Sequence, residues 1–185
     1  MENAATLCKR QTKRGEPVAV LMFDLDHFKS INDRFGHSMG DEVLRLFARV
    51  TRSSTRLNDI IGRFGGEEFV AILPGWLEVA EKVAERIHSA FETAAVAVCG
   101  QAVGAIVSIG AAVSYDAARS IDALIALADA ALYRAKHDGR NRVFAAESEV
   151  ASERARLIAA ARRTRPTEGK AFARISQRSS IVRSA

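Results

Sequence analysis

The sequence predicts an α/β (α+β) sandwich, in which helices flank a central mixed sheet. Apolar runs of strand length interleave with segments whose apolar residues recur every three to four positions. With 185 residues and 48% hydrophobic content, the chain is long enough for one domain plus an appendage. We expect the domain to span residues 1–145 and a tail to span residues 146–185.

The first expected elements are a strand and two helices. Residues 18–24, VAVLMFD, form an apolar run that ends in an acid, as is typical of a central strand buried on both faces. Asp26 occupies the position of a helix N-cap before HFKSINDRFG. A second helix is expected at about 38–54, where apolar residues follow helical spacing: Met39, Val43, Leu44, Phe47 and Val50.

A hairpin is expected next. The stretches IIGRF, residues 60–64, and EFVAILP, residues 68–74, have the composition of short strands. Gly65 and Gly66 join them, which predicts a tight turn that needs positive φ.

The remaining elements alternate again between helix and strand. Gly139 is expected to stop the last helix. The predicted order is a helix from Trp76 to about Phe91, β-branched strands at 94–100 and 102–114, a helix over Ile121–His137 and a short strand at 142–146.

The basic character of the chain resides in its tail. The sequence pI is about 9.6. Residues 146–185 hold nine Lys or Arg against four Glu, and the rest of the chain carries equal numbers of basic and acidic residues. We expect the tail to be partly helical and then disordered, because its Ser/Arg/Gly end has little to bury. An arm that binds RNA or a membrane surface is the alternative.

Cysteine usage and hydropathy indicate a soluble, cytoplasmic protein. Cys8 and Cys99 show neither metal-site spacing nor a disulfide framework, which fits a reducing compartment where buried thiols act as small apolar residues. No apolar run approaches the roughly 18 residues that a membrane span needs. The first residues also lack the apolar middle of a secretory signal.

Glu67 and Glu68 follow two glycines, at a hairpin tip that could lie beside the strand ending near Asp24. Three carboxylates that converge on one point are costly unless a cation is present. Oxygen ligands without nearby His or Cys favour Mg²⁺ or Mn²⁺, and two such ions could activate a hydroxyl and neutralise a phosphate. The glycines would let a nucleotide come close. Alternatively, both glutamates are only polar residues at a solvated tip.

Four stretches of the sequence resemble, in order, the GGDEF family of diguanylate cyclases: FDLDHFKSINDRFGHSMGDEVL, RLNDIIGRFGGEEFVAILP, SIGAA and ADAALYRAKHDGRN. The match runs from about Val18 to Phe144. The resemblance implies synthesis of cyclic di-GMP from two molecules of GTP. It also implies a five-stranded sheet similar to nucleotidyl cyclase and polymerase palm domains, and a homodimer in which each domain holds one GTP.

The family signature, in its GGEEF form, falls on residues 65–69. By this resemblance Asp24 and Glu67 are catalytic, metal-binding carboxylates, with the Leu25 carbonyl as a further ligand and Glu68 close by. Glu67 would also help to deprotonate the attacking 3′-hydroxyl. The reaction would be an in-line displacement at the α-phosphate with pyrophosphate leaving. Asp24 could instead be only a strand-end acid.

The same resemblance implies a set of substrate-binding residues. Asn32 and Asp41 would select guanine, because a carboxylate can accept from guanine N1–H and its exocyclic amine, whereas adenine presents the wrong pattern. Alternatively, Asn32 is only an amide on a helix surface, and Asp41 is an acid favoured by the dipole at a helix N-terminus. The alternative for Lys136 and Arg140 is that they are solvated basic residues near a helix end. The implied contacts to GTP are the backbone N–H groups of His27 and Phe28, then Asn32, Asp41, Gly65 and Gly66, and finally Lys136 and Arg140 at the terminal phosphates.

A second constellation precedes the hairpin. Arg56 and Asp59 form an RxxD pattern, and five residues separate Asp59 from Gly65. This placement resembles the family's inhibitory site for cyclic di-GMP, and Arg86 matches a secondary arginine of some members. The alternative is a surface ion pair between Arg56 and Asp59, which would add little stability.

One family feature differs. Relatives usually open with a DxLTGLxNR motif, whereas this chain begins with MENAATLCKRQTKRGEP. We therefore expect either a fragment or a shortened start, and an upstream sensor or regulatory domain outside the chain. The first hypothesis is a Mg²⁺-dependent diguanylate cyclase with product inhibition. A non-catalytic module that senses GTP or cyclic di-GMP is the second. A basic-tailed RNA-binding protein is the third, and the tail disfavours it because Phe172 is its sole aromatic residue for base stacking.

Overall fold

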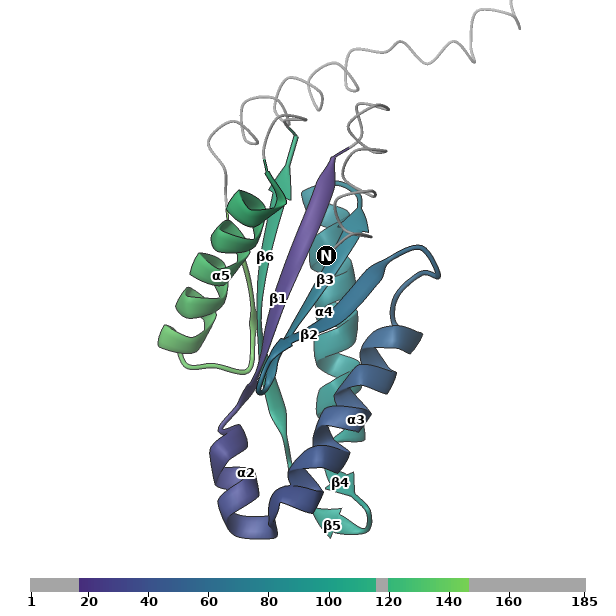
Figure 1. Ribbon diagram of the computed structural model, residues 1–185, viewed down its shortest axis with the longest axis vertical. Helices are drawn as coiled ribbons and strands as arrows, with labels where there is room; N and C mark the ends of the chain where they lie inside the picture. The colour runs from purple at the N-terminus through teal and green to yellow at the C-terminus, as the bar shows by residue number, and fades with distance from the viewer. Residues whose placement is uncertain (1–16, 116–119, 147–185) are drawn as a thin grey trace, which may run out of the picture. The chain divides into compact units, whose positions relative to one another are not determined.

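The computed structural model describes residues 17–115 and 120–146 (Figure 1). Cys8, nearly all of the predicted tail and the chain's opening segment lie outside the described residues. The described elements are β1 (Val18–Asp26), α2 (Phe28–Phe35), α3 (His37–Ser53), β2 (Ile60–Gly65), β3 (Glu68–Pro74), α4 (Leu77–Ala94), β4 (Ala97–Val98), β5 (Gln101–Ala102), β6 (Ile106–Ser114), α5 (Ile121–His137) and β7 (Val143–Ala145).

The main sheet has five strands in the order β2-β3-β1-β6-β7. Strand β1 lies at its centre and runs antiparallel to both β3 and β6, whereas β6 and β7 are parallel. All nine residues of β1 are buried, which explains why its sequence is a continuous apolar run. The predicted mixed five-stranded sheet flanked by helices is confirmed.

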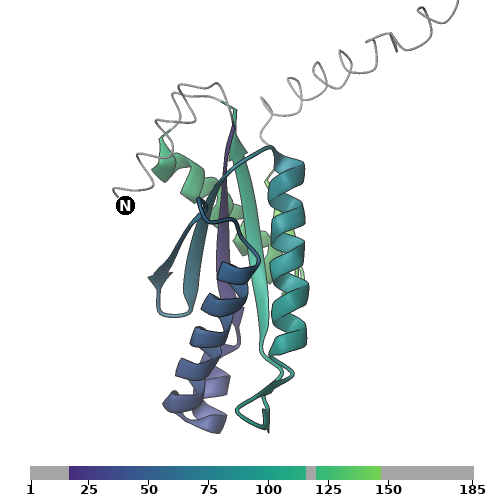
Figure 2. The ribbon, with the colours of Figure 1, turned by 90° about the vertical axis from the view of Figure 1, so that its right-hand side faces the viewer.

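Helices cover both faces of this sheet. Helix α5 packs on one face, and α3 and α4 pack on the other, the face toward the viewer in Figure 2. The α3/α4 face is filled by aromatic rings centred on Phe47, whose ring centroid lies 4.8–5.4 Å from those of Phe23, Phe69 and Phe91. On the opposite face, a Cβ at Gly110 would lie 2.1 Å from a carbonyl oxygen of α5. The glycine therefore allows that helix to approach the sheet closely.

The transition from β1 to α2 differs from the sequence prediction. Asp26 is the buried last residue of β1, and His27 is the N-cap of α2, with φ of 57°. The prediction that Asp26 caps the helix is wrong. Its carboxylate accepts a hydrogen bond from the Ser108 hydroxyl at 2.9 Å, a long-range partner that local sequence does not reveal.

The predicted hairpin strands are confirmed as β2 and β3, but their turn is built differently. Neither Gly65 nor Gly66 is among the residues with positive φ. The β2–β3 register instead shifts between Arg63 and Gly65. The Arg63 guanidinium donates to the Gly66 carbonyl oxygen at 2.8 and 2.5 Å. The chain therefore turns at residues 66–67, as predicted, but without the positive φ expected of the two glycines.

The strand predicted at 94–100 is also wrong for most of its length. Helix α4 continues to Ala94, and only Ala97–Val98 forms a strand, paired with β5 in a separate two-stranded sheet. Cys99 lies at the turn of this hairpin and is exposed, so it is not the buried thiol that the sequence suggested. Among the described residues, no helix is both long and apolar enough to cross a bilayer.

The two ends of β1 differ in chemical character. At its start, Gly75 N donates to the Pro17 carbonyl oxygen at 3.0 Å. Beside it, the Trp76 ring packs against Tyr115 with ring centroids 5.5 Å apart. At the other end of the strand are the acids Asp24 and Asp26. The predicted catalytic residues therefore lie at the acidic end, away from the tryptophan.

Candidate functional site

The acidic end of β1 adjoins the β2–β3 turn, as the sequence predicted (Figure 1). Asp24 stands opposite Glu68 in the antiparallel register of β1 and β3. The Leu25 amide donates to the Glu67 carbonyl oxygen at 3.3 Å. The GGEE segment is therefore fastened to the strand end by backbone pairing.

Asp24 is paired with a basic residue from α5. Its side chain is 11% exposed, and its Oδ2 lies 2.6 Å from Lys136 Nζ. Burial raises the pKa of Asp24 above its usual range, Lys136 opposes that shift, and the charges of Glu67 and Asp26 reinforce it. Negative charge is thus concentrated here, and one lysine from a distant part of the sequence partly offsets it.

The structure modifies the expected convergence of three carboxylates. In residues 17–115 and 120–146, no three His, Cys, Asp or Glu side chains gather as a metal-binding group. Lys136 lies against Asp24 instead. The negative charges that raise the pKa of Asp24 nevertheless come from two carboxylates, Glu67 and Asp26. An all-oxygen donor set of this kind fits Mg²⁺ or Mn²⁺ better than zinc.

The start of α2 follows directly after the acidic strand end. His27 is exposed and left-handed, and this conformation turns the chain from strand to helix within one residue. The first bond of the new helix runs from Ile31 N to the His27 carbonyl oxygen at 3.2 Å. Amides of the first helical turn have no acceptor within the helix, so this end suits an anion.

Asn32 and Asp41 come together where α2 meets α3. The Gly36 amide donates to the Asn32 carbonyl oxygen at 2.8 Å and closes α2. A Cβ at Gly40 would lie only 1.9 Å from Asn32 Oδ1, so the asparagine side chain occupies the space above that glycine. The next residue, Asp41, is exposed. The two residues predicted to read guanine therefore belong to one small surface.

The two predicted phosphate-binding residues are each paired with an acid of β1. Lys136 contacts Asp24, and Arg140 Nε lies 3.9 Å from Asp26 Oδ1. Arg140 follows the end of α5 and has φ of 63°. Its amide donates to the Ala135 carbonyl oxygen at 2.9 Å. The end of α5 thus supplies the positive charge beside the acidic strand end.

The sequence analysis missed some of the residues that organise this end. Ser108 and Asn141 both contact the Asp26 carboxylate, and Asn141 also contacts α4. Both lie within the stretches SIGAA and ADAALYRAKHDGRN, which carry the family resemblance. That resemblance was the available signal, because neither residue stands out by periodicity or charge.

The RxxD segment forms a loop between α3 and β2. Asp59 is 6% exposed, and its Oδ2 accepts from the Arg56 amide at 2.8 Å. The Arg52 guanidinium donates to the backbone oxygens of Arg56 and Asp59. The ion pairs of the described residues do not include an Arg56–Asp59 side-chain pair. Asp59 therefore shapes the loop, while the Arg56 side chain is exposed.

Arg86 joins this loop from α4. Its Nε and Nη2 donate to the Ser54 carbonyl oxygen at 3.2 and 2.7 Å. These bonds bring an arginine from 32 positions away in the sequence to the end of α3. All three residues predicted for product binding thus lie at or beside one loop.

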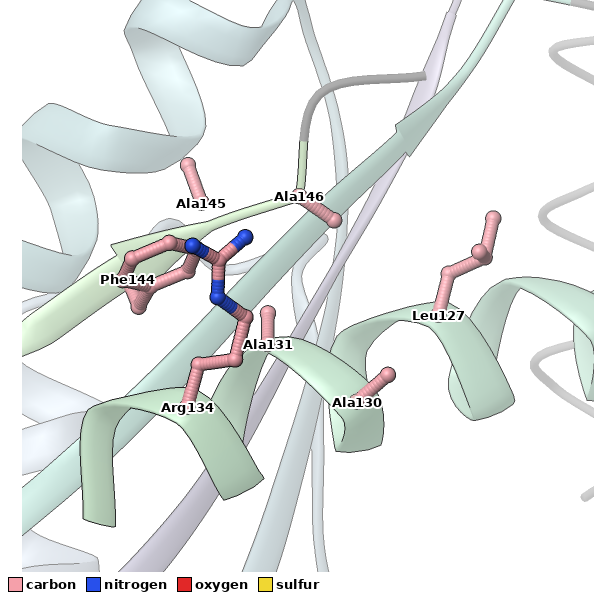
Figure 3. A pocket seen from close by; sticks show the side chains of 7 residues that line it. All are labelled: Leu127, Ala130, Ala131, Arg134, Phe144, Ala145 and Ala146. Carbon is pink, nitrogen blue, oxygen red and sulfur yellow. The ribbon is translucent and has the colours of Figure 1, made fainter. Parts of the chain in front are cut away.

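A separate cavity of about 460 Å³ lies between α5 and the β7 edge (Figure 3). The Arg134 guanidinium covers the Phe144 ring at 4.1 Å from its centroid, and Leu127 and Ala146 line the far side. None of the predicted site residues lines this cavity. It is distinct from the acidic end of β1.

The sheet order, the acidic end of its central strand and the adjoining basic residues define an α+β domain with a charged site at one end of its sheet. The family model described as "Diguanylate cyclase, GGDEF domain" matches residues 1–142. The chain belongs to the GGDEF family, as the sequence resemblance predicted.

Two curated relatives agree with this assignment. The response regulator PleD of Caulobacter vibrioides is 43% identical over 141 residues, which are 75% of this chain and 31% of that protein. Diguanylate cyclase A of Treponema denticola is 38% identical over 144 residues, which are 77% of this chain and 38% of that protein. The chain therefore spans about a third of the length of these relatives.

A solved structure agrees with the fold. The GGDEF domain of DgcB from Caulobacter crescentus, in complex with c-di-GMP, superimposes with a TM-score of 0.73. The two chains are 32% identical, and the match covers 80% of this chain and 88% of that one.

Proposed function

We propose that this chain is the catalytic GGDEF domain of a diguanylate cyclase, which condenses two GTP into cyclic di-GMP. One observation carries the proposal: the end of β1 places Asp24 beside the GGEEF hairpin and beside Lys136 of α5. The curated relative from Treponema denticola, named a diguanylate cyclase, supports it. We assign the activity to residues 1–145, because β7 ends at Ala145.

We propose that Asp24 and Glu67, with the Leu25 carbonyl and with Glu68 close by, hold Mg²⁺ or Mn²⁺, two ions per site. Members of the family generally use a divalent metal. A bound ion would neutralise phosphate charge and favour ionisation of the attacking hydroxyl. The position of Asp24 opposite the GGEE hairpin supports this assignment, because the negative charges of Glu67 and Asp26 act on Asp24 and a bound cation would offset them.

The chain's own residues would bind and orient the nucleotide. Asn32 and Asp41 recognise the guanine base, and Lys136 and Arg140 bind the terminal phosphates. The GGEE backbone at Gly65 and Gly66 and the amides of His27 and Phe28 complete the contacts.

The chemical step is a displacement at phosphorus. The 3′-oxygen of one GTP attacks the α-phosphorus of the other, Glu67 accepts the hydroxyl proton, and the bond to pyrophosphate breaks. A second, equivalent step closes the ring and releases a second pyrophosphate. Positioning and charge neutralisation supply most of the rate.

Both steps need two nucleotides face to face, so we propose a homodimer in which each domain contributes one GTP. An upstream sensor or regulatory domain would control this pairing. Two facts support the idea: the chain spans about a third of its curated relatives, and PleD is named a response regulator.

We further propose that cyclic di-GMP inhibits the domain through Arg56, Asp59 and Arg86. The exposed Arg56 would bind product phosphate, and the buried Asp59 and the Arg86 bonds would hold the loop in shape. The DgcB domain, solved with c-di-GMP, supports product binding by this fold.

The proposal is tested by incubating the purified chain with GTP and Mg²⁺ and separating the nucleotides by chromatography. We expect cyclic di-GMP and pyrophosphate to form, and excess chelator to stop the reaction. A chain that binds GTP but forms no product, even at concentrations that dimerise it, would support the non-catalytic sensing module instead.

A further inference from the structure

The Asp26 carboxylate is fully buried, and the reaction proposed above gives it no role. Its side chain is 0% exposed. The Ser108 hydroxyl lies 2.9 Å from both of its oxygens, and the Asn141 amide donates to Oδ2 at 3.1 Å. Burying a charge is costly unless such partners are present, so the carboxylate is a fixed anchor for the segment after α5.

That segment adopts an unusual backbone conformation. Gly139, Arg140 and Asn141 have φ of 113°, 63° and 45°, three left-handed residues in succession. Such conformations cost free energy for residues other than glycine and persist only where surrounding contacts determine them. Arg140 is one of the two predicted phosphate-binding residues. The direction in which its side chain leaves the backbone therefore depends on those contacts.

Asn141 supplies contacts on the other side of the segment. Its Oδ1 lies 2.9 Å from His88 Nε2, and its Nδ2 donates to Glu92 Oε1 at 2.8 Å. Both partners belong to α4, about one helical turn apart. Asn141, the residue after Arg140, therefore links the end of β1 to α4: its backbone N–H contacts Asp26, and its side-chain amide contacts His88 and Glu92.

We propose that Asn141, held by Asp26, His88 and Glu92, is a positioning residue that aims Arg140 at the terminal phosphates of GTP. This inference rests on the nucleotide-binding role of Arg140 in the proposed function. Asn141 and its α4 partners act through Arg140. Their loss should weaken binding of a triphosphate and leave binding of a monophosphate unchanged.

His88 is the cleanest position for a test, because it lies within a regular helix and is not one of the proposed GTP contacts. His88→Leu removes the hydrogen-bond donor, and His88→Gln keeps an N–H donor at a similar reach. Glu85→Ala, at an exposed residue of α4, is the matched control. The ligands are 3′-deoxy-GTP, which lacks the attacking hydroxyl and is not condensed, and 3′-deoxy-GMP.

Calorimetry with Mg²⁺ gives the ratio of the two affinities for each protein. We expect His88→Leu to weaken 3′-deoxy-GTP binding about three- to tenfold, because a misaimed Arg140 would weaken its charge-assisted bond to phosphate by about the size of one ordinary hydrogen bond. Binding of 3′-deoxy-GMP should stay within about twofold. His88→Gln should restore the wild-type ratio, and Glu85→Ala should not change it.

Equal weakening of both ligands, or no weakening, in folded His88→Leu would overturn the proposal. If that variant does not fold, Asn141→Gly serves instead, because glycine accepts the left-handed conformation and removes the amide. The same selective loss is expected there. A wild-type chain that binds both ligands equally would contradict the assignment of Arg140 and this inference with it. Failure to form cyclic di-GMP would count against the proposed activity alone, because the present comparison measures binding.

Discussion

The acidic end of β1 and the loop between α3 and β2 are both rich in charge, but they are built in opposite ways. At the strand end, Asp24 and Asp26 pair with Lys136 and Arg140, more than 100 positions away in the sequence. In the loop, the Asp59 carboxylate accepts a hydrogen bond from the backbone amide of Arg56, only three positions away in the sequence.

This difference teaches which function can be altered alone. Residues at the strand end belong to the buried centre of the sheet, so substitutions there act on the site and on folding together. The loop is held by Asp59 and by the guanidinium groups of Arg52 and Arg86, and no hydrogen bond from the exposed Arg56 side chain contributes to that shape among the described residues. Product binding should therefore be separable from synthesis. The predictions below probe that separation.

The largest effect is expected for Glu67→Gln, which keeps the shape of the hairpin tip and removes its charge. Loss of the proposed base and metal ligand should lower the rate of cyclic di-GMP formation about 100-fold or more. Product affinity at the loop should not change. Initial rates with Mg²⁺ test the first statement and calorimetry the second. A wild-type rate in this variant would refute the role assigned to Glu67.

A smaller effect, confined to the other region, is expected for Arg56→Ala. Each charge-assisted hydrogen bond to phosphate contributes roughly 1.5–3 kcal/mol, so cyclic di-GMP affinity should fall about tenfold or more. Affinity for GTP should hold. The control is Arg45→Ala, which removes an exposed arginine paired with Glu42. Each protein is titrated with GTP and with cyclic di-GMP. Unchanged affinity for cyclic di-GMP in Arg56→Ala would contradict the proposal that this loop binds the product.

Gly40→Ala should impair base recognition at the junction of α2 and α3, which lies outside both regions and belongs to the proposed GTP site. The new methyl group would meet Asn32 Oδ1 at 1.9 Å and displace the side chain. Loss of one hydrogen bond to guanine should weaken GTP binding about fivefold and narrow the preference over ATP. Gly62→Ala in β2 is the control, because the nearest atom to its Cβ would be 4.0 Å away. Equal GTP affinities in the two variants would argue against a base-reading role for Asn32.

The smallest effect is expected for Glu81→Gln on α4, which belongs to neither region. Burial, and then repulsion by Glu78 and Glu85, raise the pKa of Glu81 above 4.5 in the folded protein. The Glu81 carboxyl therefore binds its proton more tightly in the folded state than in the unfolded state. The free energy of unfolding falls as the pH rises from 4.5 through the raised pKa of the folded protein. Glutamine should raise the free energy of unfolding by roughly 0.2–0.5 kcal/mol at pH 7 and have no effect near pH 4. Urea unfolding at both pH values, with nucleotide affinities as a control, checks the sign.

Elements defined by local pattern were predictable from the sequence. Strand β1, both hairpin strands and α5 lie where the apolar runs and helical spacing placed them. The extension of α4 through Ala94 was not predicted, because the following alanines and valines suit either structure and only packing decides.

Contacts between distant segments were not predictable from pattern. Asp26 lies just before a helix, a position that in the sequence looks the same as that of a capping residue. Its actual partner, Ser108, is 82 positions away. Asn141 and His88 are 53 positions apart. The family resemblance supplied Lys136 and Arg140 as phosphate-binding candidates but gave no account of what orients them.

The packing of Trp76 on Tyr115 at the start of β1 has a practical consequence for spectroscopy. Trp76 is the single tryptophan of the 185-residue chain, and it is 37% exposed. The nine residues of β1 separate it from the acidic end by roughly 26 Å at 3.3 Å per residue. Emission excited at the red edge of indole absorption will therefore report unfolding of the sheet and stay nearly constant when a nucleotide binds.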